Sequence, residues 1–176
     1  MSRLKKVVRN IIILTILLFL LFMTSGLHLT PIAANEHSER SKHYGPSEVV
    51  HVENFEKVKY ILCKYDKWVS CSTVNKELFF FWRIKNQIIE FEYDKTKAID
   101  YTLRSMEGNF SIYGIVNDDK VKKIEVTSLG GEVFTQTDFY DDLFLLIWKL
   151  DNDYDWGIKN IKGYDSDNNV IFEEKF

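Results

Sequence analysis

Short apolar runs separated by polar residues recur about every ten residues after Pro46, and this spacing limits the fold more than any other feature. The runs are rich in Val, Ile, Phe, Tyr and Trp, and the intervals between them hold Asp, Asn, Gly and Lys. β-Branched and aromatic side chains favour strands, whereas the interval residues favour turns. The sequence therefore predicts an all-β fold, an antiparallel β-sandwich.

The expected strands fall into two sets. They are 48–52, 58–65, 68–73, 78–84 and 87–93, followed by 110–116, 121–127, 132–135, 143–150, 158–164 and 170–174. Polar residues and a glycine between the sets predict a seam at 105–109. Residues 54–62 also fit a helix, and so do residues 138–148 with Thr137 as the cap. The continuous apolar run 143–148 fits a strand that is buried on both faces.

The first 34 residues are expected to direct export. The segment contains four bases and no acid, and the bases precede an apolar run. Within that run, residues 11–23, Thr15 is the only polar residue. This is the pattern of a secretory signal. One reading is an uncleaved transmembrane anchor, because residues 11–29 approach the roughly 20 that cross a bilayer. The other reading is a signal peptide cleaved after Ala34. Both place the rest of the chain outside the cytoplasm, on the cell membrane or secreted.

Three parts follow from these patterns: a signal peptide or anchor at 1–34, a polar tether at 35–46 and an extracytoplasmic β domain at 47–176. The chain has 23 bases and 26 acids, and four of the bases lie in the first part, so residues 35–176 carry a formal charge of −7. Nucleic-acid binding needs clustered Lys and Arg. We therefore expect no nucleic-acid partner.

The histidines and the acidic turns do not form a predicted metal site. The four histidines are His28, His37, His43 and His51. Two of them fall on the expected tether, whereas a metal needs ligands on a rigid scaffold. The run from Asp151 to Asp155 begins like a calcium loop, but its sixth and twelfth positions are Trp156 and Lys162 instead of Gly and Glu. We expect no metal and no cofactor.

Catalytic motifs are also missing from the sequence. It has no Gly-x-Ser-x-Gly turn and no glycine-rich phosphate loop, and a catalytic serine would need a histidine from the tether as its base. The chain is therefore not expected to be an enzyme. The candidate ligand-binding residues are Tyr154 and Trp156 with Asp153 and Asp155, since an aromatic beside carboxylates suits a sugar ring or a protein partner.

Cys63 and Cys71 are the only cysteines and are expected to form a disulfide. If residues 58–65 and 68–73 form a hairpin centred on Lys67, then residue 63 lies opposite residue 71. Directly opposed residues hold their Cα atoms about 4.5 to 5.5 Å apart, which a disulfide accepts. Export would allow the bond to form. The alternative is two small buried thiols.

Several stretches resemble a family of uncharacterised membrane-anchored or secreted proteins of Bacillus-type Gram-positive bacteria. They are residues 28–31 (HLTP), 43–47 (HYGPS), 79–83 (FFFWR), 112–118 (IYGIVND) and 161–165 (IKGYD). The resemblance implies an extracytoplasmic location and brings no activity. The C-terminal seventy residues also resemble an immunoglobulin-like β-sandwich, through Tyr113-Gly114, the turn Gly130-Gly131 and the pairing of 161–164 with 170–172.

Together these features predict a non-catalytic binding or interaction module at the bacterial cell envelope. The alternative is a protein that binds or modifies cell-wall carbohydrate. Its expected partners are the membrane, through residues 11–29 if they are not cleaved, and an envelope protein or cell-wall polymer.

Overall fold

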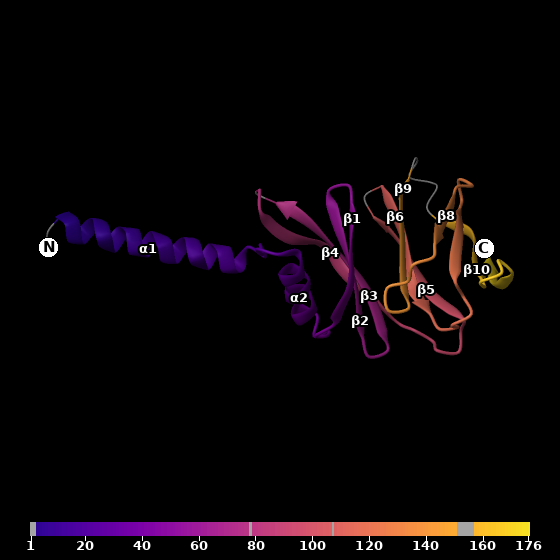
Figure 1. Cartoon of the computed structure of the whole chain (residues 1–176). Helices are drawn as coiled ribbons and strands as arrows, with labels where there is room; N and C mark the ends of the chain where they lie inside the picture. Colours follow the sequence, from indigo (N-terminus) through magenta and orange to yellow (C-terminus); the bar gives the residue numbers. More distant parts are fainter. Residues whose placement is uncertain (1–2, 78, 107, 151–156) are drawn as a thin grey trace.

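A computed structural model describes residues 3–77, 79–106, 108–150 and 157–176 (Figure 1). The fold is mostly β, with antiparallel strands in three sheets and two helices. The helices are α1 (Arg3–Thr24) and α2 (Pro31–Ser41). The strands are β1 (Glu48–Phe55), β2 (Val58–Tyr65), β3 (Trp68–Glu77), β4 (Phe81–Glu92), β5 (Ile99–Met106), β6 (Asn109–Val116), β7 (Lys123–Ser128), β8 (Val133–Gln136), β9 (Leu143–Lys149), β10 (Ile158–Tyr164) and β11 (Val170–Lys175).

The three sheets are stacked as layers. Sheet A has the strand order β1-β2-β3-β4, sheet B has β5-β6-β9, and sheet C has β11-β10-β7-β8. Sheet B lies between the other two, and α2 covers the outer face of sheet A (Figure 1). Helix α1 extends away from this body on the side of sheet A, and the C-terminus lies at the opposite end.

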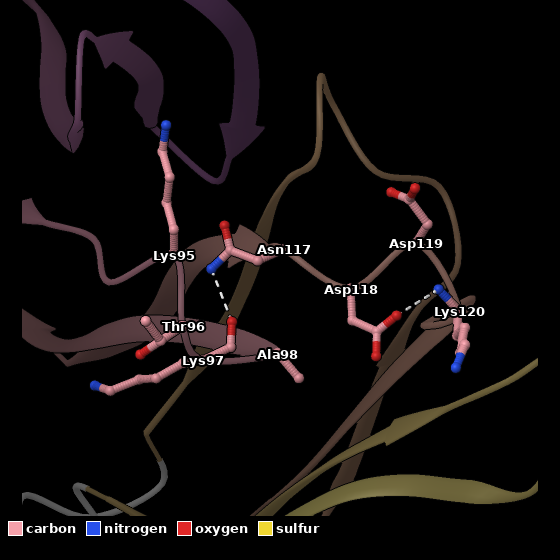
Figure 2. A pocket seen from close by; sticks show the side chains of 8 residues that line it. All are labelled: Lys95, Thr96, Lys97, Ala98, Asn117, Asp118, Asp119 and Lys120. Atoms are coloured by element: carbon pink, nitrogen blue, oxygen red, sulfur yellow. Dashed lines mark hydrogen bonds between the residues drawn. The ribbon is translucent and has the colours of Figure 1, made fainter.

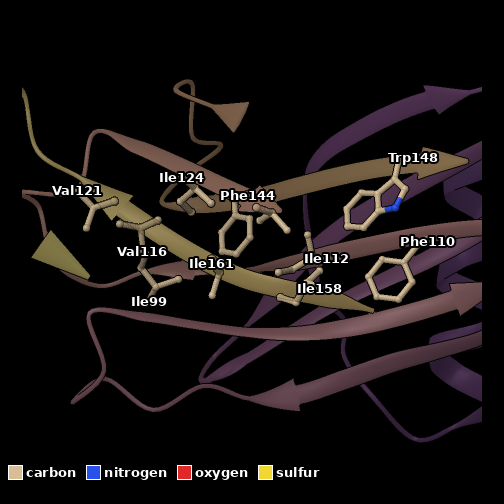
Figure 3. Packing of buried hydrophobic residues seen from close by; sticks show 11 residues of the cluster. Ile99, Phe110, Ile112, Val116, Val121, Ile124, Phe144, Trp148, Ile158 and Ile161 are labelled. Atoms are coloured by element: carbon tan, nitrogen blue, oxygen red, sulfur yellow. The ribbon is translucent and has the colours of Figure 1, made fainter. Parts of the chain in front are cut away.

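Sheet B contributes to a core on each of its faces. Facing sheet C, it places Phe110, Ile112, Phe144 and Trp148 against residues of β7 and β10 (Figure 3). The side chains between these in sequence point to sheet A, where they meet Tyr60, Leu62, Val69 and Cys71. Every residue of β6 is buried. The alternation of side chains along a strand therefore explains why 143–148 is apolar throughout, and it confirms a strand buried on both faces.

Helix α2 occupies the region expected to be a tether. Thr30 caps it by accepting a hydrogen bond from the Ala33 N–H, and Pro31 stands at the first helical position, where its missing N–H costs nothing. Its buried face consists of Ala34, Asn35, Ser38 and Glu39. Three of these four side chains are polar, so the helix is held on sheet A largely by hydrogen bonds.

The prediction of a membrane-spanning helix over 11–29 is wrong. No helix among the described residues has the combination of length and hydropathy needed to cross a membrane. The count of nineteen residues fails because α1 ends at Thr24. Beyond it, Gly26 takes a positive φ of 70° and His28 pairs with Trp82 in a β-bridge. The helical apolar segment thus runs from Ile11 to Thr24, about 21 Å at 1.5 Å per residue, against the ~30 Å of a bilayer core.

The predicted disulfide is also wrong, because Cys63 and Cys71 are free and buried. The hairpin between β2 and β3 has a two-residue turn at Asp66 and Lys67, so Tyr65 lies opposite Trp68. Cys71 therefore faces Leu62, one position away from the expected register. A one-residue shift moves a side chain to the other face of a sheet. Cys63 points to α2, and Cys71 points to sheet B.

Candidate binding surface

The connection between β3 and β4 presents aromatic side chains to solvent. Phe79 is 92% exposed and Phe80 is 58% exposed. Phe79 has a φ of 65°, in the left-handed region that a tight turn requires and that a phenylalanine rarely adopts. Isolated exposed apolar residues are common, but two consecutive exposed phenylalanines on a strained turn are not explained by packing. We call Phe79, Phe80 and Phe81 the aromatic tip.

Backbone pairing on both sides of β4 holds the aromatic tip in place: the ladder with β3 and a single β-bridge to His28. At its base, Glu77 lies opposite Phe81, and the Glu77 carboxylate lies 3.2 Å from the Arg83 guanidinium. On the other side of β4, the Trp82 N–H donates to the His28 carbonyl at 2.7 Å, and the His28 N–H donates to the Trp82 carbonyl at 2.8 Å. The tip is therefore fixed both to sheet A and to the segment that leaves α1.

A chain of aromatic rings connects the tip to α1. The Phe80 and Phe81 ring centroids are 4.3 Å apart, and those of Phe81 and Phe22 are 5.2 Å apart. Such tilted pairs are favourable beyond the area they bury. The Arg83 guanidinium also donates to the Ser25 carbonyl at 3.0 Å. The end of α1 and the tip thus form one continuous structure.

Apolar exposure continues from this junction along α1. Every residue from Arg3 to Leu21 is exposed, and this segment includes the apolar run that begins at Ile11. Leu29, which precedes α2, and Ile32, in its first turn, are also exposed. Together with Phe79 and Phe80 of the tip, these side chains make up most of the exposed large apolar residues in the described part of the chain.

A second candidate is a polar hollow between two loops of the body (Figure 2). It has a volume of about 460 Å³ and is lined by Lys95, Thr96, Lys97, Ala98, Asn117, Asp118, Asp119 and Lys120. The Asn117 amide donates to the Asp94 and Lys97 carbonyls at 3.1 and 2.9 Å, and the Lys120 N–H donates to the Asp118 carboxylate at 3.0 Å. The two bonds of Asn117 join the two loops, and the bond of Lys120 stays within one of them. The Thr96 hydroxyl donates to the Asp94 carboxylate at 2.7 Å within the other loop.

Asp153, Tyr154, Asp155 and Trp156, predicted from the sequence as ligand-binding residues, lie outside the described residues. The carbohydrate-binding platform expected there stays a prediction.

Three of the four histidines lie in regular structure: His28 in a β-bridge, His37 on α2 and His51 on β1, whereas His43 lies in the turn after α2. The His51 ring stacks on Tyr140 with centroids 3.6 Å apart, and its Nε2 lies 3.0 Å from the Glu53 carboxylate. The His28 and His37 rings are 4.9 Å apart, and burial, followed by His37 and Arg40, lowers the pKa of His28. Within the described part of the chain, no three His, Cys, Asp or Glu side chains gather as metal ligands would.

Sequence reasoning missed the aromatic tip because it assigned residues 78–84 to the interior of a strand. The polar residues Lys85 and Asn86 predicted the turn between two expected strands, 78–84 and 87–93. In the structure β4 runs through that interval, and the chain turns among aromatic residues that carry no turn signal. The three consecutive phenylalanines were the available clue, since alternation would leave one on the outer face of a strand.

Comparisons with protein-family models, curated proteins and solved structures found no match for this chain.

Proposed function

We propose that this chain is a non-catalytic interaction module at the bacterial cell envelope, and that the aromatic tip is its contact surface. The observation that carries the proposal is the exposure of Phe79 and Phe80 on a hairpin whose base is fixed on both sides. Aromatic side chains on a rigid support are effective anchors, because they bury a large area and lose little conformational entropy.

An extracytoplasmic location is part of the proposal. It is supported by the basic N-terminus followed by an apolar run, which is the pattern of an export signal. The resemblance to secreted or membrane-anchored proteins of Bacillus-type bacteria points the same way. The chain would then act on the outer side of the membrane or as a released protein.

We further propose that β5 to β11 form an immunoglobulin-like sandwich. The order β5-β6-β9 in one sheet and β11-β10-β7-β8 in the other supports this, because the chain crosses between two facing sheets as in that fold. The expected seam at 105–109 corresponds to the connection from β5 to β6, which pair along their whole length. Many surface domains use such a sandwich as a scaffold, and the fold alone implies no particular ligand.

The test is photo-crosslinking in cells. A benzophenone amino acid replaces Phe79 in the full chain, and the matched control carries it at Ile171, an exposed position on β11 at the far end of the body. We expect a covalent adduct with an envelope component from position 79 and little from position 171. No adduct at 79, or equal yields at the two positions, would contradict the proposed function.

A further inference from the structure

We propose that the partner of the aromatic tip is a lipid surface with anionic headgroups, in which the tip and the apolar part of α1 are buried without crossing it. This inference rests on the proposed function and names its partner. Three independent features of the described residues support it: the shape of the apolar surface, its length and the charge around it.

The shape of the apolar surface excludes a conventional protein groove. Helix α1 is exposed on all sides from Arg3 to Leu21, and the tip is joined to its end by the contact of Phe81 with Phe22. A folded partner that receives a helix in a groove covers one face of it. A lipid phase adapts to any convex shape and covers every face at once.

The length of the apolar segment suits an interface. The helical run from Ile11 to Thr24 has fourteen residues. Runs of about 10 to 14 apolar residues are typical of interfacial segments and signal sequences instead of spans. Exposed aromatic rings are a common feature of segments that bind lipid interfaces, and the exposed Phe80 ring reaches the end of α1 through Phe81.

The charge around the tip differs in sign from that of the body. Residues 76–85 contain Lys76, Arg83 and Lys85 against the single acid Glu77, whereas residues 35–176 as a whole carry a formal charge of −7. Four further exposed bases lie at the start of α1, at the end of the helix that is remote from the tip. Basic residues beside an apolar surface favour anionic lipids by about 1 kcal/mol each, and an acidic body is repelled by them. The molecule would therefore approach such a surface with the end that carries α1 and the tip, and the C-terminus would point away from it.

A fluorophore attached at the tip tests this geometry. The full chain with Phe79→Cys is labelled with an environment-sensitive dye, and the native thiols do not interfere because Cys63 and Cys71 are buried. The control is Ile171→Cys. Both proteins are reconstituted with vesicles of phosphatidylglycerol and phosphatidylcholine. We expect a blue shift and a several-fold rise in emission from position 79, and emission typical of water from position 171. Emission typical of water at 79 in vesicle-bound protein, or no vesicle binding, would overturn the inference.

A second measurement removes the aromatic rings instead of labelling them. Phe79→Ser with Phe80→Ser is expected to lower the partition coefficient onto anionic vesicles about tenfold, since each exposed ring transfers a large apolar area. The control Val170→Ser with Ile171→Ser changes two exposed apolar residues of β11. It should change the partition coefficient less than about twofold. Equal effects of the two pairs would contradict a role of the tip.

The outcomes separate this inference from the proposed function. If position 79 forms adducts with a protein or a polymer in cells and its dye stays in water, the tip is a contact surface but lipid is not its partner. If position 79 forms no adduct of any kind, the proposed function fails as well.

Discussion

At the scale of single residues, Gly114 determines how closely β5 and β6 approach each other. It lies opposite Tyr101 in the middle layer. A Cβ atom at this position would stand 2.2 Å from the Asp100 carbonyl oxygen and 2.7 Å from the Tyr101 Cα, so that backbone atoms would have to move. Neither strand can shift freely, because β6 is buried throughout.

Gly114→Ala is therefore expected to lower the free energy of unfolding by about 1–3 kcal/mol, as overpacked core positions do. Gly130→Ala is the control, since its nearest neighbour would be the Ser128 hydroxyl at 3.6 Å, and its effect should stay within about 0.5 kcal/mol. Urea denaturation of both variants measures the difference. Equal midpoints would show that the two strands can separate without cost.

The two thiols make a second prediction at this scale. Burial raises the pKa of Cys63 and of Cys71 to about 12. The thiolate is the reactive form. At pH 8 we expect neither thiol of the native protein to react quickly with an aromatic disulfide reagent, and both to react at once in denaturant. Fewer than two reactive thiols in denaturant would show that Cys63 and Cys71 form a disulfide after all.

The same pKa shifts affect stability. Both folded values lie above the unfolded value of about 8.5, so the stability contributed by the neutral thiols is fully present below that pH. It is lost as the pH rises toward 12, because the unfolded chain ionises first.

At the scale of elements, the sequence predicted strands better than it predicted their partners. Strands β2 and β10 have the expected bounds. Strand β2 is a mostly apolar run, and an aspartate that favours a turn follows each of the two strands, Asp66 after β2 and Asp165 after β10. Strand β5 was missed since its second face carries Asp100 and Arg104. Both are buried and satisfied: the Asp100 carboxylate accepts from the Asp94 N–H, and the Arg104 guanidinium donates to the Cys71 carbonyl. Polar residues with buried partners cannot be distinguished from exposed ones in a sequence.

Helix α2 was missed for the same reason, and without it the sequence could not predict the candidate binding surface. The Asn35 amide donates to the Glu39 carboxylate at 2.9 Å, and its oxygen accepts from the Ser72 hydroxyl at 2.5 Å. A helix held by such bonds has no apolar stripe to reveal it. The segment from α1 to α2, which supports the aromatic tip, could therefore not be placed in advance.

We expect Asn35→Ala to loosen α2 selectively. The change leaves the Ser72 hydroxyl without its acceptor and removes one donor from the Glu39 carboxylate, which keeps the backbone N–H and the hydroxyl of Ser47 as donors. The lost bonds cost about 1–3 kcal/mol. Because Cys63 lies beneath α2 and Cys71 lies on the other face of sheet A, the labelling rate of Cys63 should rise about tenfold or more and that of Cys71 should not.

The control for this experiment is Glu36→Ala, which removes an exposed side chain whose only described ion pair is with Arg40 on the same helix. It should leave both labelling rates within about twofold of the native ones. Mass spectrometry of labelled peptides gives the two rates separately. Parallel acceleration of both thiols by Asn35→Ala would mean that the whole body opens instead of the helix.

At the scale of the whole molecule, sheet B links the two cores. Neighbouring residues of β9 serve different cores: Leu143 packs against sheet A, and Phe144 packs against sheet C. Sheet A and sheet C share no core cluster among the described residues, so any cooperation between them passes through the middle layer. A layer that is buried on both faces loses part of its support when either neighbour detaches.

This arrangement predicts that a substitution in the core between sheets A and B also destabilises sheet C. Leu143→Ala should lower the free energy of unfolding by about 2–5 kcal/mol through the cavity it leaves between sheets A and B. If the body unfolds as one unit, amide hydrogen exchange will then speed up by a similar factor in β2 and in β10, although β10 does not contact Leu143. Faster exchange in β2 with native rates in β10 would instead show that sheet A with α2 opens alone, leaving β5 to β11 folded.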